Sequence, residues 1–332
     1  MPIQPLPFEK PIVELEQKLN ELRRFSEAQA IDVSEEIRRM EERLAEMRRR
    51  INADLSPWHI VQIARHPQRP YTRDYLQYWK CDFLELHGDR RYADDQAIVG
   101  GFARIEGRRV MLIGTQKGRD MKSNVRCNFG CAYPEGYRKA LRLMQLADKF
   151  GLPIVTLIDT PGAYPGVQSE ERHIAEAIAV NLREMFTFSV PIVVAIVGEG
   201  GSGGALGIGV GDRILILQNA YYSVISPEGC AAILWRDKAF ADRAAEALKL
   251  TAPDLLKAGL VDEIVPEPDG GAHARPEETA QRLAAAIVRH LDELTAIEPA
   301  ARMAGRYEKF RRMGVFREEV GSTPAHSNME SA

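Results

Sequence analysis

The residues with the clearest chemical potential form a glycine-rich segment at positions 198–204, which reads Gly-Glu-Gly-Gly-Ser-Gly-Gly. The segment follows a predicted buried strand and precedes a predicted helix. Glycine has no Cβ atom, so this backbone can take positive φ angles and bring its N–H groups close to a bound oxygen atom. N–H groups at a helix start also carry the positive end of the helix dipole. The segment therefore predicts an oxyanion hole; the alternative is a tight turn that needs glycine only for close packing.

Two other interpretations of this segment are weaker. Residues 200–204 match the G-x-S-x-G motif of serine hydrolases, with Ser202 as the nucleophile. A hydrolase also needs a downstream histidine, and the candidates lie in a linker, a helix and the tail, at His273, His290 and His326. The glycines at 198, 200 and 203 fit G-x-G-x-x-G, the dinucleotide-binding motif. However, residues 218–220 offer no acidic side chain for a ribose.

A second motif begins at Asp159, at the end of another predicted strand. Its sequence D-T-P-G is similar to a GTPase motif, but the chain has no G-x-x-x-x-G-K-[ST] loop to hold the phosphates. The carboxyl ends of strands are nevertheless the ligand-binding face of open α/β sheets. We therefore expect this segment to form a wall of the site, with the residues Asp159, Thr160, Pro161, Gly162, Ala163 and Tyr164.

These motifs together predict oxyanion donors without a convincing nucleophile or metal cluster. Such a site stabilises enolates or related anions. The chemistry can then come from the substrate, or from a cofactor that another chain carries.

The four cysteines, Cys81, Cys127, Cys131 and Cys230, contain no C-x-x-C pair. This spacing favours free thiols in a reducing cytoplasm over a disulfide framework or a zinc ribbon, and we expect no metal site in this chain.

The overall composition is that of a globular protein. The chain has 332 residues, of which 45% are hydrophobic and 27% are charged. The formal net charge of −3 provides no basic excess for nucleic acid. The apolar runs are too short for a membrane span. Residues 1–11 are proline-rich and lack the apolar core of a signal peptide, so we expect none.

Residues 1–56 predict a helical hairpin extension. Apolar residues recur every three or four positions within residues 11–52, in two sets separated by a short turn at Asp32. Each set covers two heptads, which is too short for a long coiled coil, so the two helices should pack on each other.

Residues 57–298 predict one α/β domain, because apolar strands alternate with helices. The expected strands are Ala97–Ile105, Val110–Gln116, Pro153–Ile158, Pro191–Val197, Ile214–Leu217, Tyr221–Ile225 and Leu260–Val265. The main expected helices are Pro134–Phe150, Glu170–Thr187 and Glu277–Ile297. Residues 299–332 should form a basic C-terminal helix and, from Gly321, a disordered tail.

An ordered series of motifs over residues 85–265 resembles the biotin-dependent acyl-CoA carboxyltransferases. The matching segments are His87–Arg90, Asp94–Gly101, Gly114–Arg119, Pro134–Ala140, Leu157–Gly166, Gly198–Gly204 and Tyr222–Ala231. The helical region ahead of them is similar to that of the alpha subunits of bacterial and plastid acetyl-CoA carboxylase carboxyltransferases. An ordered series of this length is far more specific than any single motif.

The resemblance implies a crotonase-like fold of repeated ββα units and an α2β2 heteromer whose active site lies between unlike subunits. It implies that the beta subunit carries a zinc ribbon and the main coenzyme A site, while the alpha subunit provides the biotin side. The implied partners are the beta subunit, the biotin carboxyl carrier protein and the ATP-dependent biotin carboxylase. The implied reaction carboxylates acetyl-CoA to malonyl-CoA for fatty acid biosynthesis.

The resemblance also implies roles for individual residues. Backbone N–H groups of Gly203 and Gly204 would stabilise the ureido oxygen of biotin as carboxybiotin releases its carbon dioxide. Other residues expected to contact substrate are Gly200, Gly201, Ser202 and Ser226, together with Lys117 and Arg119 as partners of coenzyme A phosphates.

The sequence departs from the family pattern in two places. Residues 171–177 read E-R-H-I-A-E-A where the family has E-R-G-Q-S-E-A, so His173 replaces a glycine and Ala175 a serine. Residues 129–133 read F-G-C-A-Y where a methionine and a histidine are usual. A hypothesis of another class also stays open, namely a crotonase-like hydratase or hydrolase that acts alone on an acyl-CoA.

Overall fold

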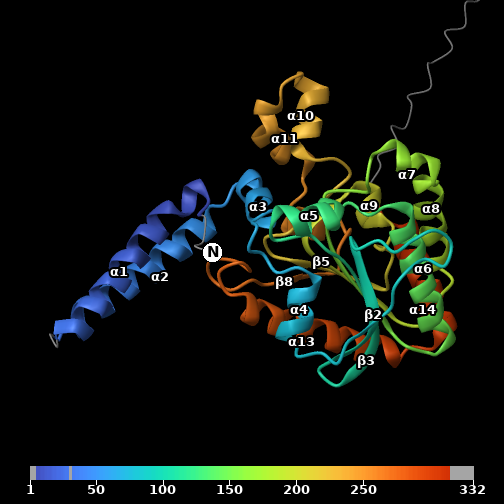
Figure 1. Ribbon diagram of the computed structural model, residues 1–332, viewed down its shortest axis with the longest axis horizontal. Coiled ribbons are helices and arrows are strands. Elements are labelled where there is room, and N and C mark those ends of the chain that lie inside the picture. Colours follow the sequence, from blue (N-terminus) through green and yellow to red (C-terminus); the bar gives the residue numbers. More distant parts are fainter. Residues whose placement is uncertain (1–4, 30–31, 315–332) are drawn as a thin grey trace, which may run out of the picture.

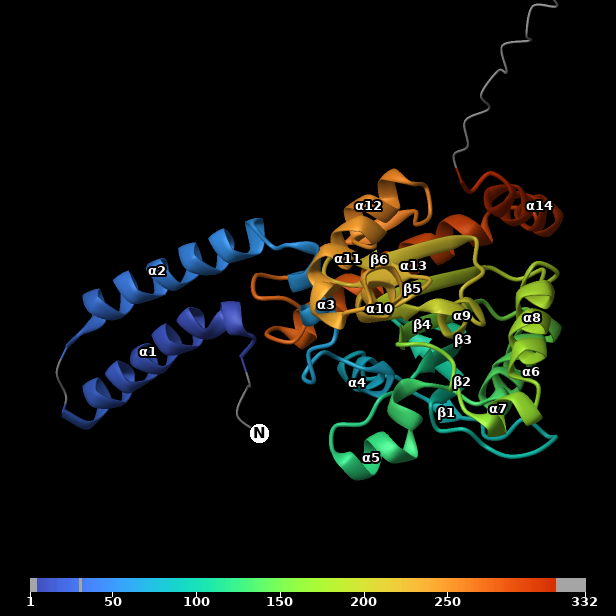
Figure 2. The same cartoon turned by 90° about the horizontal axis from the view of Figure 1, so that it is seen from above.

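The structure is a computed structural model that describes residues 5–29 and 32–314. The chain opens with a 3-10 turn, Pro7–Glu9, and two long helices, α1 (Lys10–Gln29) and α2 (Ser34–Ala53), which lie side by side and extend away from the body (Figures 1 and 2). They pack through one apolar seam, which confirms the predicted hairpin; its members are Ile12, Leu15, Leu19, Ile37, Met40, Leu44, Met47 and Ile51. The predicted disordered tail lies outside the described residues.

The hairpin is anchored to the body by a small polar cluster at its base. Glu9 Oε1 lies 3.0 Å from His273 Nε2, and the His273 ring stacks on His66 at 4.1 Å between centroids. Phe8 packs against His59 at 4.4 Å. Residues far apart in the sequence are therefore joined where the arm meets the domain.

The body is built on one sheet with the strand order β1-β2-β3-β4-β5-β6-β8, and β7 pairs with the end of β5. The strands are β1 (Leu84–Glu85), β2 (Ile98–Ile105), β3 (Arg108–Thr115), β4 (Ile154–Thr160), β5 (Ile192–Gly201), β6 (Arg213–Leu217), β7 (Tyr221–Ser223) and β8 (Glu263–Val265). The first three strands pair antiparallel, and the pairs from β3 onward are parallel. Strands β4 and β5 are buried along their whole length, as continuous apolar strands in a parallel sheet must be.

Helices cover the sheet, and one pair projects from it. The body helices are α3 (Pro57–Ala64), α4 (Thr72–Tyr78), α5 (Met121–Arg126), α6 (Pro134–Lys149), α7 (Val167–Glu171), α8 (Ile174–Met185), α9 (Ser202–Leu206), α10 (Pro227–Trp235), α11 (Ala241–Leu248), α12 (Ala252–Lys257), α13 (Pro276–Thr295) and α14 (Pro299–Arg311). Figure 1 shows α10 and α11 standing out from the body above α5. The α/β class predicted from the alternating pattern is confirmed.

The predicted helix over 170–187 is wrong in one respect, because it is broken into α7 and α8. The break lies at Arg172 and His173, where His173 has a φ of 63°. This left-handed conformation costs non-glycine residues about 1–2 kcal/mol. The resemblance noted above leads us to expect glycine at this position, and glycine is the residue that takes this conformation without strain.

Helix α14 is tied to the sheet by a buried ion pair. The Arg306 guanidinium binds both carboxylate oxygens of Asp212 at 2.8 Å and donates to the carbonyl oxygens of Met185 and Phe188. Asp212 also accepts from the N–H of Ile192, at the first residue of β5. The pair therefore links the C-terminal helix to the central strand.

Removal of one member of this pair should destabilise the fold strongly. We expect Arg306→Leu to lower the free energy of unfolding by about 3–5 kcal/mol, because it leaves the Asp212 charge buried without its partner. Urea unfolding measures this, with Arg311→Leu on the exposed part of the same helix as the control. Equal losses in the two variants would show that the buried pair has no special role.

Candidate active site

The glycine-rich segment spans the end of a strand and the start of a helix. Residues 198–201 complete β5, between β4 and β7, with Gly200 opposite both Thr160 and Tyr222. Helix α9 then begins at Ser202. The predicted strand over 191–197 therefore ends too early, because the glycines that follow it still pair in the sheet.

Close packing explains why most positions of this segment require glycine. A Cβ atom on Gly198 would lie 2.5 Å from Asp159 Oδ1, one on Gly201 would lie 2.2 Å from the Pro161 carbonyl oxygen, and one on Gly204 would lie 2.3 Å from the Gly162 carbonyl carbon. None of the three has a positive φ; the left-handed residue of the segment is Ser202, at 49°. The expectation of positive φ at the glycines is thus wrong, and close backbone packing explains them instead.

Gly203 is the exception within the segment. A Cβ atom there would meet only Ile178 Cδ1, at an ordinary 3.5 Å. Gly203 instead borders a cavity of about 430 Å³, whose lining is mostly apolar and includes Leu206, Tyr222 and Val224. Open space in front of a glycine at a helix start is what a ligand-facing residue requires.

The start of α9 lies at this cavity, which Ser202 and Gly203 border. Helix geometry leaves the first-turn N–H groups without intrahelical acceptors, and no side chain caps this helix. Residues Ser202, Gly203 and Gly204 supply these donors. The arrangement can stabilise a negative oxygen atom, and Ser202, exposed at the edge, is the only hydroxyl within this turn.

A buried charge cluster lies directly behind the segment. The Lys117 ammonium lies 2.6 Å from both Asp159 Oδ1 and Glu199 Oε2. The other Glu199 oxygen accepts from Arg65 Nε and from the Tyr221 hydroxyl, each at 2.7 Å. The Glu199 N–H also donates to Asp159 Oδ1 at 2.9 Å. Three strand ends, from β3, β4 and β5, are thus held together by one group of charges.

The charges within the cluster keep Glu199 and Lys117 ionised. Burial raises the pKa of Glu199, but the charges of Lys117 and Arg65 and the hydrogen bonds from Lys117 and Tyr221 outweigh it and hold the pKa at about 2. Burial lowers the pKa of Lys117, and the charges of Asp159 and Glu199 raise it well above its usual range. Both groups are therefore charged at neutral pH.

Comparison with known proteins identifies the family. Residues 5–314 match the acetyl co-enzyme A carboxylase carboxyltransferase-like family. The chain belongs to this carboxyltransferase family. Over 313 residues, 94% of this chain and 96% of the relative, the sequence is 56% identical to the acetyl-coenzyme A carboxylase carboxyl transferase subunit alpha of Synechococcus elongatus. It is 55% identical over 314 residues to that of Thermus thermophilus, covering 95% and 99% of the two chains.

Solved structures support the same fold at greater distance. Transcarboxylase 12S aligns with a TM-score of 0.53 at 24% identity, over 67% of this chain and 42% of that chain. The beta subunit of geranyl-CoA carboxylase from P. aeruginosa aligns with a TM-score of 0.53 at 18% identity, over 74% and 46%. The chain thus spans less than half of either protein. These likenesses show the crotonase-like fold expected from the sequence motifs, and the family membership makes the chain a carboxyltransferase subunit.

The predicted wall at 159–164 packs against the glycine-rich segment. Asp159 and Thr160 are buried, and Thr160 Oγ1 lies 2.7 Å from the Gly130 carbonyl oxygen. Residues 162 and 163 contact Gly204. The Tyr164 ring packs against the Tyr133 ring in a tilted arrangement, with 4.3 Å between centroids, so one departure from the expected family pattern lies beside this wall.

The remaining predicted residues have partners within the chain. Lys117 is held in the charge cluster, and Arg119 pairs with Asp74 and lies 4.0 Å above the Tyr71 ring. A role on coenzyme A phosphates stays a prediction for both. Ser226 Oγ accepts from the Gly229 N–H and caps α10. Two residues shortly before it, at 222 and 224, line the cavity instead.

Sequence reasoning missed Arg65, Tyr221 and Glu228 as members of the site. Arg65 also pairs with Glu228 at 2.5 Å, which ties α10 to the residue that follows α3. These residues lie 134–163 positions from Arg65 along the chain. Among the residues of the charge cluster that were not predicted to act in the site, Glu199 could have been noticed in the sequence, because it is the one charged residue within the glycine-rich segment.

Two histidines that the hydrolase hypothesis could use lie in contacts away from the glycine-rich segment. His273 bonds Glu9, and His290 bonds Glu263 at 2.6 Å, so these two downstream histidines of the hydrolase hypothesis are engaged elsewhere. Glu9, His66 and His273 form a group within 4.8 Å that could hold a metal ion. Their imidazole planes are 30° apart and stacked, however, which favours packing over coordination by both rings.

The helices were compared with the length and apolar character that a membrane span requires. Among residues 5–29 and 32–314, every helix is too short or too polar to cross a bilayer.

The charge cluster makes stability depend on pH in a defined direction. An ordinary glutamate titrates near pH 4.5, and Glu199 near 2, so its ionised form stabilises the fold fully above pH 4.5 and this contribution is lost as the pH falls toward 2. We expect Glu199→Gln to lower the free energy of unfolding at pH 7 by about 3 kcal/mol and to reduce its pH dependence between about pH 5 and 3. Urea unfolding across this range, with the exposed Glu308→Gln as control, measures both effects. An unchanged pH slope in Glu199→Gln would contradict the assigned charge state.

Proposed function

We propose that this chain is the alpha half of a carboxyltransferase that moves a carboxyl group from carboxybiotin to acetyl-CoA, giving malonyl-CoA for fatty acid biosynthesis. The family membership supports the reaction class. The observation that carries the proposal for the site is the uncapped start of α9, whose N–H groups lie beside an apolar cavity.

The cavity and the donors fit the chemistry of biotin. Biotin has an apolar bicycle and a polar ureido oxygen. The lining includes Leu206, Tyr222 and Val224, and Gly203 borders the same cavity. The N–H groups of Gly203 and Gly204, in the first turn of α9, would suit an oxygen acceptor. Carboxybiotin, when bound, supplies the carboxyl group and, after its loss, the base for the acetyl methyl proton. The N–H groups of this chain would stabilise the negative charge on the ureido oxygen, and loss of one such donor typically costs about 100- to 1000-fold in rate.

The charge cluster would position these donors. Lys117, Asp159 and Glu199 fix the strand ends from which α9 starts, so the N–H groups need not reorganise during the reaction. The described residues that line the cavity include no carboxylate, imidazole or amine, and this fits a reaction in which the cofactor itself provides the base.

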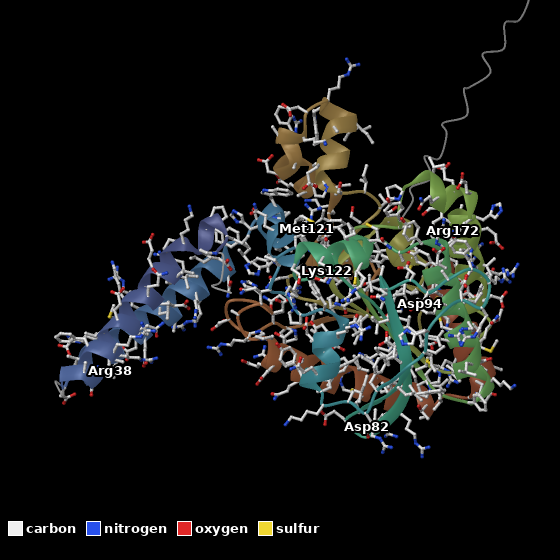
Figure 3. All side chains as sticks on the ribbon, in the orientation of Figure 1. Arg38, Asp82, Asp94, Met121, Lys122 and Arg172 are labelled. Carbon is white, nitrogen blue, oxygen red and sulfur yellow. The ribbon has the colours of Figure 1, made fainter. Side chains whose placement is uncertain are left out.

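A partner chain is part of the proposal. Helices α5, α7, α9 and α10 lie on one side of the molecule (Figure 1), and Met121 on α5 points outward there (Figure 3). These helices and the segment before α10 carry large exposed apolar side chains, namely Met121, Val125, Val167, Leu206, Val224, Ile233 and Leu234. Exposed apolar patches of this kind mark interaction sites. We assign this side to the beta subunit, which would bring the zinc ribbon and the main coenzyme A site to form an α2β2 enzyme. The biotin carboxyl carrier protein and the biotin carboxylase complete the set of partners, and the four free thiols support a cytoplasmic location.

The proposal is tested by reconstitution. The chain mixed with its beta subunit and carboxylated biotin carrier protein should form malonyl-CoA from acetyl-CoA, and the chain alone should form none. Propionyl-CoA in place of acetyl-CoA measures substrate preference. Turnover of an enoyl-CoA by the chain alone, without carboxyl transfer in the mixture, would favour the hydratase or hydrolase hypothesis instead.

The role of the α9 start is tested at Gly203. A Cβ atom there meets only Ile178, at an ordinary contact distance, so a valine adds bulk beside the cavity without a backbone clash, whereas a valine at Gly204 would displace residues 162 and 163. We expect Gly203→Val to lower the rate of carboxyl transfer about 100-fold or more while the heteromer still forms in sedimentation. The control is Gly305→Val on α14, where a Cβ atom meets nothing. Wild-type rates for Gly203→Val would remove this residue from the site.

A further inference from the structure

We propose that a second pocket, bounded by the loop 88–93, α6 and α8, binds a small multiply charged oxyanion of the phosphate class. The pocket has a volume of about 280 Å³ and is lined by four arginines and two carboxylates, namely Arg90, Arg91, Arg138, Arg142, Asp89 and Glu176. It is separate from the cavity at Gly203, with which it shares no lining residue.

The loop that forms one wall is held in a fixed shape. The buried Asp89 carboxylate accepts three backbone N–H groups through Oδ1, from Arg91, Tyr92 and Ala93 at 2.7–3.1 Å. Arg90 has a φ of 66°. A left-handed conformation of this kind in a bulky residue persists only where surrounding contacts impose it. The fold therefore accepts a strained backbone at the residue that faces the pocket.

Two guanidinium groups are held unusually close together in this pocket. Arg90 Nη1 and Arg142 Nη2 donate to the same acceptor, the carbonyl oxygen of His87, at 2.7 and 3.1 Å. Arg142 Nε also donates to the Gly88 carbonyl oxygen at 3.0 Å. Burial and the neighbouring Arg90 charge both lower the pKa of Arg142, as expected where two cations are pressed together.

The carboxylates of the pocket do not balance these cations. Asp89 uses Oδ1 for the loop and Oδ2 for Arg138, whose Nε lies at 2.8 Å. Glu176 is exposed to solvent. Within the described part of the chain, Arg90, Arg91 and Arg142 have no carboxylate within ion-pair distance, although this chain contains many arginine–carboxylate pairs elsewhere. The pocket therefore has an excess of positive charge with spare N–H donors.

The phosphate group is the ligand that suits this arrangement best. A guanidinium has five N–H donors in a planar fork. Arg90 and Arg142 use only some of theirs on carbonyl oxygens, which leaves donors on at least two sides of the pocket. Phosphate has more acceptor oxygens than a carboxylate and carries up to two negative charges near neutral pH, so it matches a pocket with several guanidinium groups in both donors and charge.

The experiment is a binding titration of the full-length chain, alone and with its beta subunit, in phosphate-free buffer. Inorganic phosphate, pyrophosphate and a nucleoside diphosphate are titrated calorimetrically at constant ionic strength, with acetate as the comparison anion. Saturable binding of at least one phosphate compound, and not of acetate, is expected; which compound binds most tightly separates free phosphate from a phosphorylated metabolite. No saturable binding, or equal binding of acetate, would overturn the proposal.

Variants locate the binding in the pocket. Arg142→Gln should weaken the affinity at least tenfold, while Arg108→Gln, an exposed arginine paired with Asp292, should leave it unchanged. Arg91→Gln provides a second test if Arg142→Gln fails to fold, because the Arg91 side chain is exposed and supports no other element. Wild-type affinity in the folded pocket variants would overturn the assignment to this pocket.

Discussion

The ammonium group of Lys117, placed between Asp159 and Glu199, is the interaction on which the active-site geometry depends. It joins the carboxyl ends of β3, β4 and β5, where the glycine-rich segment leads into α9. Burial of these charges is costly, and the cost is offset only because each one is paired and hydrogen-bonded. The charge cluster is stable only when all its members are present, and it therefore holds the glycine-rich segment in one position. That segment sets the orientation of the first N–H groups of α9.

This architecture explains why the chain can take part in catalysis without an obvious catalytic side chain. The charged groups of the site are used internally, to hold backbone in place. What lines the cavity is mostly apolar surface, with the hydroxyl groups of Ser202, Tyr222 and Ser223 and the first turn of α9. A site of this kind needs a cofactor to supply reactivity and a second surface to close it, and the exposed apolar residues around the turn indicate where that surface would pack.

Much of the fold could be predicted from the sequence, because apolar periodicity and turn residues are local signals. The hairpin seam, the α6 helix that begins at Pro134 and the buried strands β4 and β5 all follow from such patterns. The break at His173 could not be predicted locally, because its left-handed conformation contradicts the preference of the residue and is imposed by packing. The glycine-rich segment stands out in the sequence, but the packing reasons for its glycines could not be predicted, because contacts such as Gly204 with Gly162 join segments that are distant along the chain. Arg65 and Tyr221 join the site from other distant parts of the chain, and only folding brings them to Glu199.

The role proposed for the start of α9 is to stabilise the ureido oxygen of biotin. A crystal structure of this chain with its beta subunit and bound biotin would test this role. We expect the ureido oxygen to lie about 2.7–3.1 Å from the backbone nitrogen atoms of Gly203 and Gly204. A ureido oxygen bound by other groups, with these two N–H groups facing solvent or the partner chain, would contradict it.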